Sequence, residues 1–242
     1  MLQWLFWLAF AGTGVAWFQQ DTLPEPSRLA PELLNEPTQH PVTPQPFKAT
    51  ANGMEYTIHP LFDYEITGLV VSKHNADTWW DWVHSASNDH LNVTDLCVVW
   101  GDNARSGSYQ NIRFSSGQWT CNFETNSDAA FAAFNQNAIS NNHLLTDQPR
   151  LRSLLKGVRI GDQIRLSGML SEYRHQQGMD FFRGTSTVRN DTDNGACETI
   201  FVTDAQLIRP AAAHWRWLMG AGLATMLLCV VAGFLRPHRS QA

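Results

Sequence analysis

The chain has 242 residues, which is enough for one domain of ordinary size with an apolar segment at each end. It carries 17 Lys and Arg residues against 22 Asp and Glu residues, for a formal net charge of −5. Residues 21–209 hold 14 of the basic residues and all 22 acidic ones, a net charge of −8. This balance argues against binding to nucleic acid, because phosphate backbones are bound by clustered positive charge.

The chain opens with an apolar run over residues 2–18. No basic residue precedes it, and it is rich in Trp and Phe, which favours a retained transmembrane signal anchor. The alternative is a cleaved signal peptide, because Gly14-Val15-Ala16 is an acceptable cleavage sequence. We predict the retained anchor.

Residues 19–48 contain seven of the eleven prolines in the chain. This composition predicts a semi-extended linker that rises by roughly 3.1 Å per residue. A plain spacer is the simpler interpretation, and a docking segment for a partner is the alternative.

A folded domain is predicted over residues 49–210. Residues 163–173 alternate between apolar and polar side chains, as a half-buried strand does. Strands are also predicted over 54–59, 64–73, 95–101, 109–114, 118–123, 181–188 and 196–208. Helices are predicted over 75–85, 127–139 and 151–156.

This order of elements predicts a mainly β fold with short helices, in the α+β class. A helix between the middle and the late strands resembles the arrangement in an OB-like five-stranded barrel. We therefore expect such a barrel, with insertions after its first and third strands, flanked by two transmembrane helices.

Four cysteines are present, and no two form a C-x-x-C pair, so zinc-ribbon and thioredoxin chemistry have no support. We predict a disulfide between Cys97 and Cys121, because their strands are plausible neighbours. Such a bond would be worth roughly 3 kcal/mol. The alternative is three buried, reduced thiols at Cys97, Cys121 and Cys197.

The second apolar run, residues 215–235, is long enough to cross a bilayer as a helix, because about twenty residues rise roughly 30 Å. Trp215 and Trp217 suit the membrane interface. Gly220 and Ala224, with Gly222 between them, favour close helix packing, and thus association within the membrane. Gly and Ala are also simply common in such helices.

The sequence favours an extracytoplasmic domain with both chain ends in the cytoplasm. Basic residues flank the apolar runs almost evenly, so they do not decide the orientation. An apolar run at the extreme N-terminus usually directs the downstream chain across the membrane, and the domain cysteines suit an oxidising compartment.

The densest polar cluster lies between residues 183 and 198. Its charged members are candidates for a binding face, although they could equally satisfy one another as surface ion pairs: Arg183, Arg189, Asp191, Asp193 and Glu198. Asp191-x-Asp193-x-Gly195 hints at a calcium loop but lacks the distal Glu. The nine histidines show no metal-binding spacing, so we expect no metal and no other cofactor.

Four segments resemble signatures of uncharacterised bacterial membrane-anchored proteins. They are WGDN (100–103), SNNHLL (140–145), GDQIRLSG (161–168) and GACETIFV (195–202). The resemblance covers residues 54–208. It implies no activity, ligand or catalytic residue.

The sequence leaves two classes of function. The first is a non-catalytic binding or scaffold protein of the bacterial cell envelope, held in the inner membrane, whose partners are the membrane and an envelope protein or a second copy of the chain. The second is an envelope enzyme acting on a polysaccharide, with Asp102 and Glu198 as carboxylates and Trp100 as a sugar platform. Two carboxyl groups about 5–10 Å apart in a cleft would support the second.

Overall fold

The computed structural model describes residues 2–43, 45–176, 180–188, 190, 197–211 and 213–235. The chain divides into two compact units. One unit is a pair of terminal helices, and the other is a globular domain spanning Leu23–Ala211.

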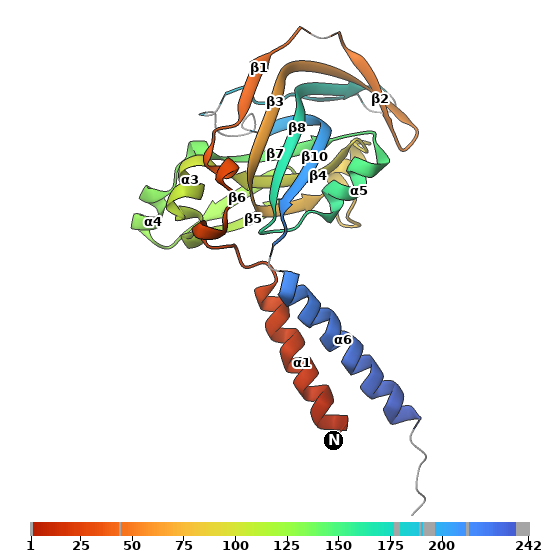
Figure 1. The fold of residues 1–242 in the computed structure, drawn as a ribbon. Coiled ribbons are helices and arrows are strands. Elements are labelled where there is room, and N and C mark those ends of the chain that lie inside the picture. The colour runs from red at the N-terminus through yellow and green to blue at the C-terminus, as the bar shows by residue number, and fades with distance from the viewer. Residues whose placement is uncertain are drawn as a thin grey trace, which may run out of the picture. The chain divides into compact units, whose positions relative to one another are not determined.

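The terminal helices are α1 (Leu2–Gln19) and α6 (Ala213–Phe234), which pack against each other (Figure 1). Their contact relies on Gly222, because a Cβ there would overlap the Thr13 side chain and lie 3.2 Å from the Ala9 carbonyl oxygen. A Cβ at Gly220 would meet nothing within 4 Å. The predicted association through Gly220 therefore stays a prediction, whereas Gly222 serves packing within the chain.

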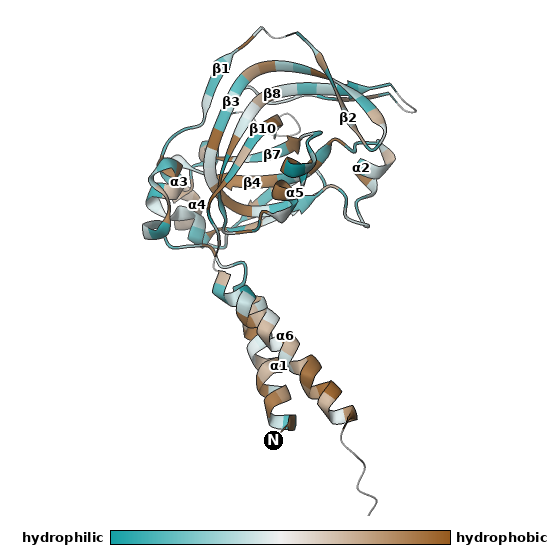
Figure 2. Ribbon diagram, turned by 45° about the vertical axis from the view of Figure 1, so that its right-hand side comes forward, coloured by the Kyte–Doolittle hydropathy of each residue, from teal (hydrophilic) through white to brown (hydrophobic). Residues whose placement is uncertain are grey.

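Among the described residues, α6 is the one helix long and apolar enough to cross a membrane (Figure 2). The helix α1 is apolar over most of its length, but Gln3 and Gln19 lie near its ends. Its crossing of the membrane stays a prediction.

Five strands of the globular domain form a closed ring (Figure 1). In order around the ring they are β3 (Met54–Asn75), β4 (Asn92–Val99), β7 (Ile139–Leu145), β10 (Cys197–Arg209) and β8 (Gln163–His175). Pairing of β8 with β3 closes it, and all neighbours are antiparallel except β7 and β10. The predicted class, mainly β with short helices, is confirmed.

The ring closes because β3 is long and changes partner along its length. Its residues 57–69 pair with β8, and its residues 69–75 pair with β4. Gly68 lies where the partner changes, and a Cβ there would collide with Val98 and with the Val99 carbonyl oxygen. Glycine in a strand allows this kind of close backbone approach at a bend.

The remaining strands extend or flank the ring. They are β1 (Thr38–Pro41) and β2 (Phe47–Ala51) on β3, β9 (Phe181–Arg183) on β8, and the separate hairpin β5 (Arg113–Gly117) with β6 (Thr120–Glu124). The short helices are α2 (Trp82–Ala86), α3 (Gly101–Ser106), α4 (Asp128–Ala133) and α5 (Pro149–Gly157). Single 3₁₀ turns are η1 (Pro26–Arg28), η2 (Pro31–Leu34), η3 (Ser108–Asn111) and η4 (Gln136–Ala138).

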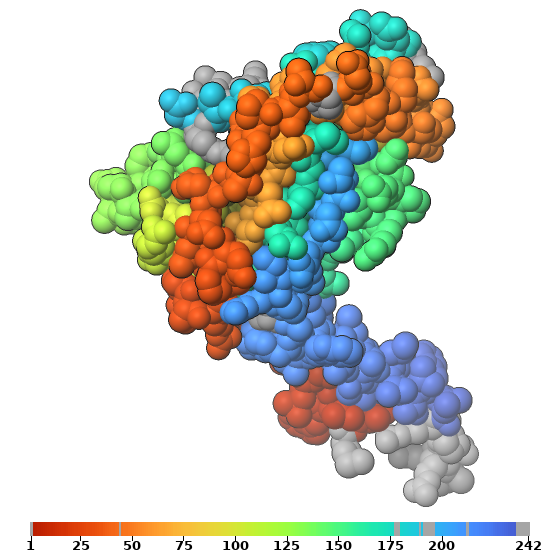
Figure 3. All heavy atoms as spheres, turned by 45° about the horizontal axis from the view of Figure 1, so that its top comes forward, coloured from red at the N-terminus to blue at the C-terminus, as the bar shows by residue number. Residues whose placement is uncertain are grey.

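The proline-rich segment differs from the expected spacer. From Leu23 onward it belongs to the globular domain, and Figure 3 shows it in orange-red along the domain surface. Its prolines start two 3₁₀ turns that bury Leu29 and Leu33 against the domain. The Tyr109 hydroxyl donates to the Pro24 carbonyl oxygen (2.5 Å). Apolar burial between the prolines thus outweighs their tendency to stay extended.

A disulfide joins Cys97 in β4 to Cys121 in β6, which confirms the predicted pair. It ties the β5–β6 hairpin to the ring. Of the four cysteines, all in described residues, Cys197 and Cys229 carry free thiols.

Candidate functional site

The candidate site arises from the register of three neighbouring strands. Asp95 in β4 lies directly opposite His143 in β7. In the parallel pair of β7 with β10, Cys197 lies beside Asn141, and Thr199 lies beside His143. Side chains two residues apart on a strand share a face, so Asp95, His143 and Cys197 line up on one side of the sheet.

The three side chains form a row. His143 Nδ1 lies 2.7 Å from Asp95 Oδ1, and both side chains are fully buried. The imidazole of His143 lies near enough to the Cys197 thiol for each group to shift the pKa of the other, and Asn141 Nδ2 lies 3.6 Å from Cys197 Sγ. Because an ionised carboxylate only accepts, Asp95 fixes the proton on Nδ1 and directs Nε2 of the same ring toward other partners.

Neighbouring groups in the row stabilise the charged forms of Asp95, His143 and Cys197. Burial alone would raise the pKa of Asp95, but the charge and hydrogen bond of His143 lower it to about 2. Burial alone would lower the pKa of His143, but Asp95 raises it to about 9. Burial raises the pKa of the partly exposed Cys197 thiol, yet His143, Asn141 and Arg183 together lower it by more.

Arg183, in β9, reaches the same histidine. Its Nη2 donates to Nε2 of His143, and its guanidinium carbon lies 4.5 Å from the centre of the Trp119 ring. This contact belongs to the neutral imidazole, because a guanidinium has no acceptor atom. When Nε2 takes up a proton, Arg183 loses that acceptor, and the charge of Arg183 is among the influences that lower the pKa of Cys197.

A buried network continues from Asp95 toward the loop between β3 and β4. Asn92 Nδ2 donates to Asp95 Oδ1 (2.8 Å) and to His84 Nε2 (2.9 Å). Trp119 donates twice, from Nε1 to His84 Nε2 (2.6 Å) and from its backbone N to Asp95 Oδ2 (3.2 Å). These contacts orient the His84 ring and the Asp95 carboxylate.

A second trio has donor atoms typical of a metal site. Nε2 of His74 and Nδ1 of His84 each lie 2.6 Å from Asp81 Oδ2, and all three side chains are buried. Because the indole N–H of Trp119 is a donor only, Nε2 of His84 must accept and Nδ1 must carry the proton. A metal ion needs a lone pair at Nδ1, so this arrangement is a hydrogen-bond network.

A pocket of about 600 Å³ opens beside this trio. Trp79, which is almost fully exposed, lines this pocket. Burial raises the pKa of Asp89 in the pocket wall, and its Oδ2 accepts a hydrogen bond from the Tyr173 hydroxyl (2.6 Å). Polar side chains lining the pocket include Asp77, Asp81, His84, Asp89, Asn92 and Arg152.

The residues predicted from the sequence occupy separate places. Arg183 lies in the site. Trp100 is buried, with its Nε1 donating to Glu36 Oε2 (3.0 Å), so its ring offers no face to a sugar. Asp102 is exposed and paired with Arg105 on α3.

Glu198 is buried in β10, whereas Asp102 is exposed on α3. The two carboxylates named for polysaccharide chemistry therefore do not share a described pocket. Arg189, Asp191 and Asp193 lie outside the described residues.

Sequence reasoning missed Asp95, His143 and Cys197 as a group. A signal was present, because Asn141-Asn142-His143 interrupts a run that is otherwise suited to burial. Three consecutive polar residues are all buried in β7, and each needs a partner there. The sequence does not say that β4 and β10 supply two of them.

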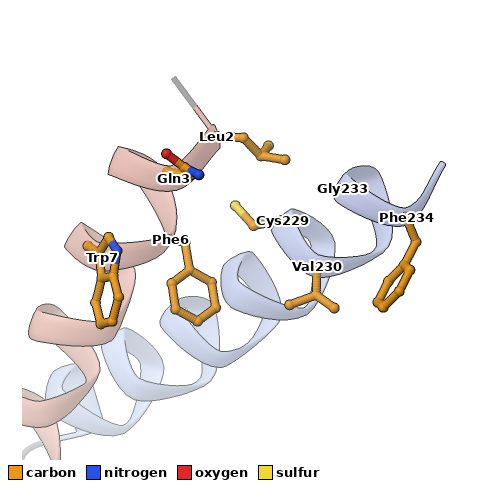
Figure 4. Close-up of a pocket in the computed structure, with 8 residues that line it drawn as sticks. All are labelled: Leu2, Gln3, Phe6, Trp7, Cys229, Val230, Gly233 and Phe234. Atoms are coloured by element: carbon orange, nitrogen blue, oxygen red, sulfur yellow. The ribbon is translucent and has the colours of Figure 1, made fainter. Parts of the chain in front are cut away.

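A further cavity, of about 490 Å³, lies within the terminal helix pair (Figure 4). Phe6 and Trp7 of α1 line it together with Cys229, Val230 and Phe234 of α6. Its lining is largely apolar and offers little for chemistry.

Comparison with protein-family models, with curated proteins and with solved structures finds no match to this chain. The function therefore rests on the geometry of the site.

Proposed function

We propose that this chain is a membrane-tethered binding protein of the bacterial cell envelope. Its globular domain lies outside the cytoplasm and takes a polyhydroxylated ligand, a segment of envelope glycan, into the 600 Å³ pocket. The observation that carries the proposal is the pocket itself, in which buried carboxylates and an amide lie next to an exposed tryptophan.

The ring of strands supports an OB-like barrel as the finer description of the fold. By their order along the chain, β3, β4, β7, β8 and β10 are the first to fifth strands of the ring. Around the ring, the fourth strand (β8) lies beside the first (β3), and the second (β4) and third (β7) follow. This order is that of a Greek key. The helix α5 follows the third strand. OB-folds bind oligosaccharides and oligonucleotides through the loop after the first strand and the loop before the fifth.

The position of the pocket supports this proposal, because it lies at the loop after the first ring strand. Nine of its lining residues come from the loop between β3 and β4. Carboxylate and amide oxygens accept hydrogen bonds from sugar hydroxyls, and an indole face packs against the apolar face of a sugar ring. The negative charge of the domain disfavours nucleic acid, which leaves the glycan as the better candidate.

Two further features support an extracytoplasmic location of the domain and a membrane anchor. A disulfide such as Cys97–Cys121 persists in oxidising compartments outside the cytoplasm. The helix α6 has the length and composition of a membrane anchor.

Binding of soluble peptidoglycan oligosaccharides to the detergent-solubilised full-length protein tests the proposal. We expect Trp79→Ala to weaken binding by about tenfold, or ~1.4 kcal/mol, because the indole face is lost. Trp82→Ala is the matched control, since Trp82 is also exposed but does not line the pocket. Equal affinity of the two variants, or tighter binding of a polyamine than of the glycan, would reject the glycan pocket.

A further inference from the structure

We propose that Cys197, His143 and Asp95 form a nucleophilic thiol site that acts on acyl groups. The proposal goes beyond ligand binding, because it assigns a covalent reaction to the row of residues across β4, β7 and β10. It also revises the expectation of a purely non-catalytic domain.

The arrangement gives each residue a separate role. A nucleophile, a base within hydrogen-bonding reach and a third group that orients the base are the parts that such catalysis requires. Cys197 is the nucleophile and His143 the base, while Asp95 holds the imidazole by the 2.7 Å contact to Nδ1. The proton on Nδ1 leaves Nε2 as the atom that takes the thiol proton.

Cys197 is available for this chemistry. The other two cysteines of the globular domain are joined to each other, so Cys197 keeps its thiol. It is partly exposed at the start of β10, whereas His143 and Asp95 behind it are fully buried. Cys197 is therefore partly accessible, while the charge-bearing pair is kept from water.

One donor contacts the sulfur and a second lies one residue further away. Asn141 Nδ2 lies 3.6 Å from Sγ, which also lies 4.0 Å from the Trp119 carbonyl oxygen, and Arg183 donates to the imidazole of His143. Donors aimed at the position of a developing oxyanion stabilise a tetrahedral intermediate. Asn141 and Arg183 are therefore the groups that would bind the carbonyl oxygen.

The reaction balances with water as the only co-reactant. In the charged pair, Nε2 of His143 already holds the thiol proton, and the thiolate sulfur bonds to the carbonyl carbon while the C=O electron pair moves to oxygen. When this pair returns, the bond to the leaving group breaks, and the leaving group takes the proton from His143. Water then attacks the resulting thioester, gives a proton to His143, and releases a carboxylic acid and the regenerated thiolate.

The test treats the full-length protein with p-nitrophenyl acetate and locates the acetyl group by mass spectrometry. We expect acetyl-Cys197 to form in the wild type, and His143→Gln to slow its formation by about 100-fold or more, the usual contribution of a general base. Cys229→Ser, in α6, is the control and should leave the rate unchanged. An unmodified Cys197, or equal rates with and without His143, would overturn the proposal.

A second measurement uses only the wild type, in case the variants fail to fold. The rate of alkylation of Cys197 by iodoacetamide, followed against pH, should stay high below the pKa of about 8.5 of a free thiol. The groups that lower the pKa of Cys197 are His143, Asn141 and Arg183, and the Trp119 carbonyl oxygen also lies 4.0 Å from the sulfur. A profile that matches an ordinary free thiol would overturn the proposal, and it would leave glycan binding at Trp79 untouched.

Discussion

At the scale of single residues, Asp95 is the most connected group of the site. Its two carboxylate oxygens accept hydrogen bonds from His143, from Asn92 and from the backbone N of Trp119. A buried carboxylate is tolerated only when it is paired and hydrogen-bonded in this way. Asp95 therefore both orients the base and keeps β4, β7 and the β5–β6 hairpin in register.

We expect Asp95→Asn to destabilise the domain by about 2–3 kcal/mol near neutral pH, since the folded-state pKa of Asp95 is held at about 2 against an ordinary 3.8. A carboxyl group with a lowered pKa contributes stability that is present above its unfolded pKa and is lost as the pH falls. The difference between wild type and variant should thus shrink between about pH 4 and pH 2.

Urea unfolding of the two proteins across this pH range measures the effect. Asp102→Asn is the control, because its carboxylate is exposed and pairs only on the surface, so its effect should stay below about 0.5 kcal/mol. A difference for Asp95→Asn that does not change with pH would show that the loss comes from packing instead of from charge.

At the scale of elements, two glycines allow the ring to close. Besides Gly68 in β3, Gly168 in β8 lies against the backbone of β10, where a Cβ would overlap the carbonyl oxygen of Phe201. These contacts are with backbone atoms, which cannot rotate away as a side-chain end does. The close pairing of β8 with β10 therefore depends on glycine.

Gly168→Ala should consequently lower the free energy of unfolding by about 2 kcal/mol or more, the range for overpacking in a tightly packed region. Gly184→Ala is the matched control, because a Cβ there would meet only Phe182 at 3.9 Å, an ordinary contact. Urea denaturation measures both variants, and equal stability of the two would show that β8 and β10 can separate without cost.

Much of the element order was predictable, and the exceptions have physical reasons. Residues 163–173 alternate cleanly and form β8, and α5 covers the predicted helix 151–156. The strand β7 was missed because Asn141, Asn142 and His143 are polar, although in the fold the two amide nitrogens and the imidazole find hydrogen-bond partners. The predicted helix over 75–85 forms only at Trp82–Ala86, where Asp81 accepts a bond from the His84 backbone N.

The candidate site was less predictable than the fold. Arg183 was named from its polar neighbourhood, but Asp95, His143 and Cys197 are separated by 48 and 54 positions in the sequence. Only the ring order β4, β7, β10 brings them together. Pairing between strands this distant depends on the whole ring, which local periodicity does not report.

At the scale of the whole molecule, the cysteines connect the fold to the compartment. We expect the wild-type protein from cells to carry the Cys97–Cys121 bond in a non-reduced peptide map, with Cys197 unpaired. A variant that lacks residues 2–18 would stay in the reducing cytoplasm, where these thiols remain reduced. Without the bond, which closes a sequence separation of 24, the domain should lose about 3 kcal/mol of stability.

The Cys97→Ser, Cys121→Ser double variant with an intact N-terminus is the control that separates compartment from covalent bond. It should match the shortened protein in stability while still reaching the membrane fraction. We expect the Cys97–Cys121 bond to be absent from the variant without residues 2–18 and present in the wild-type protein. Reduced thiols in the intact protein would place the domain on the cytoplasmic side, because an extracytoplasmic pair this close in space would be oxidised.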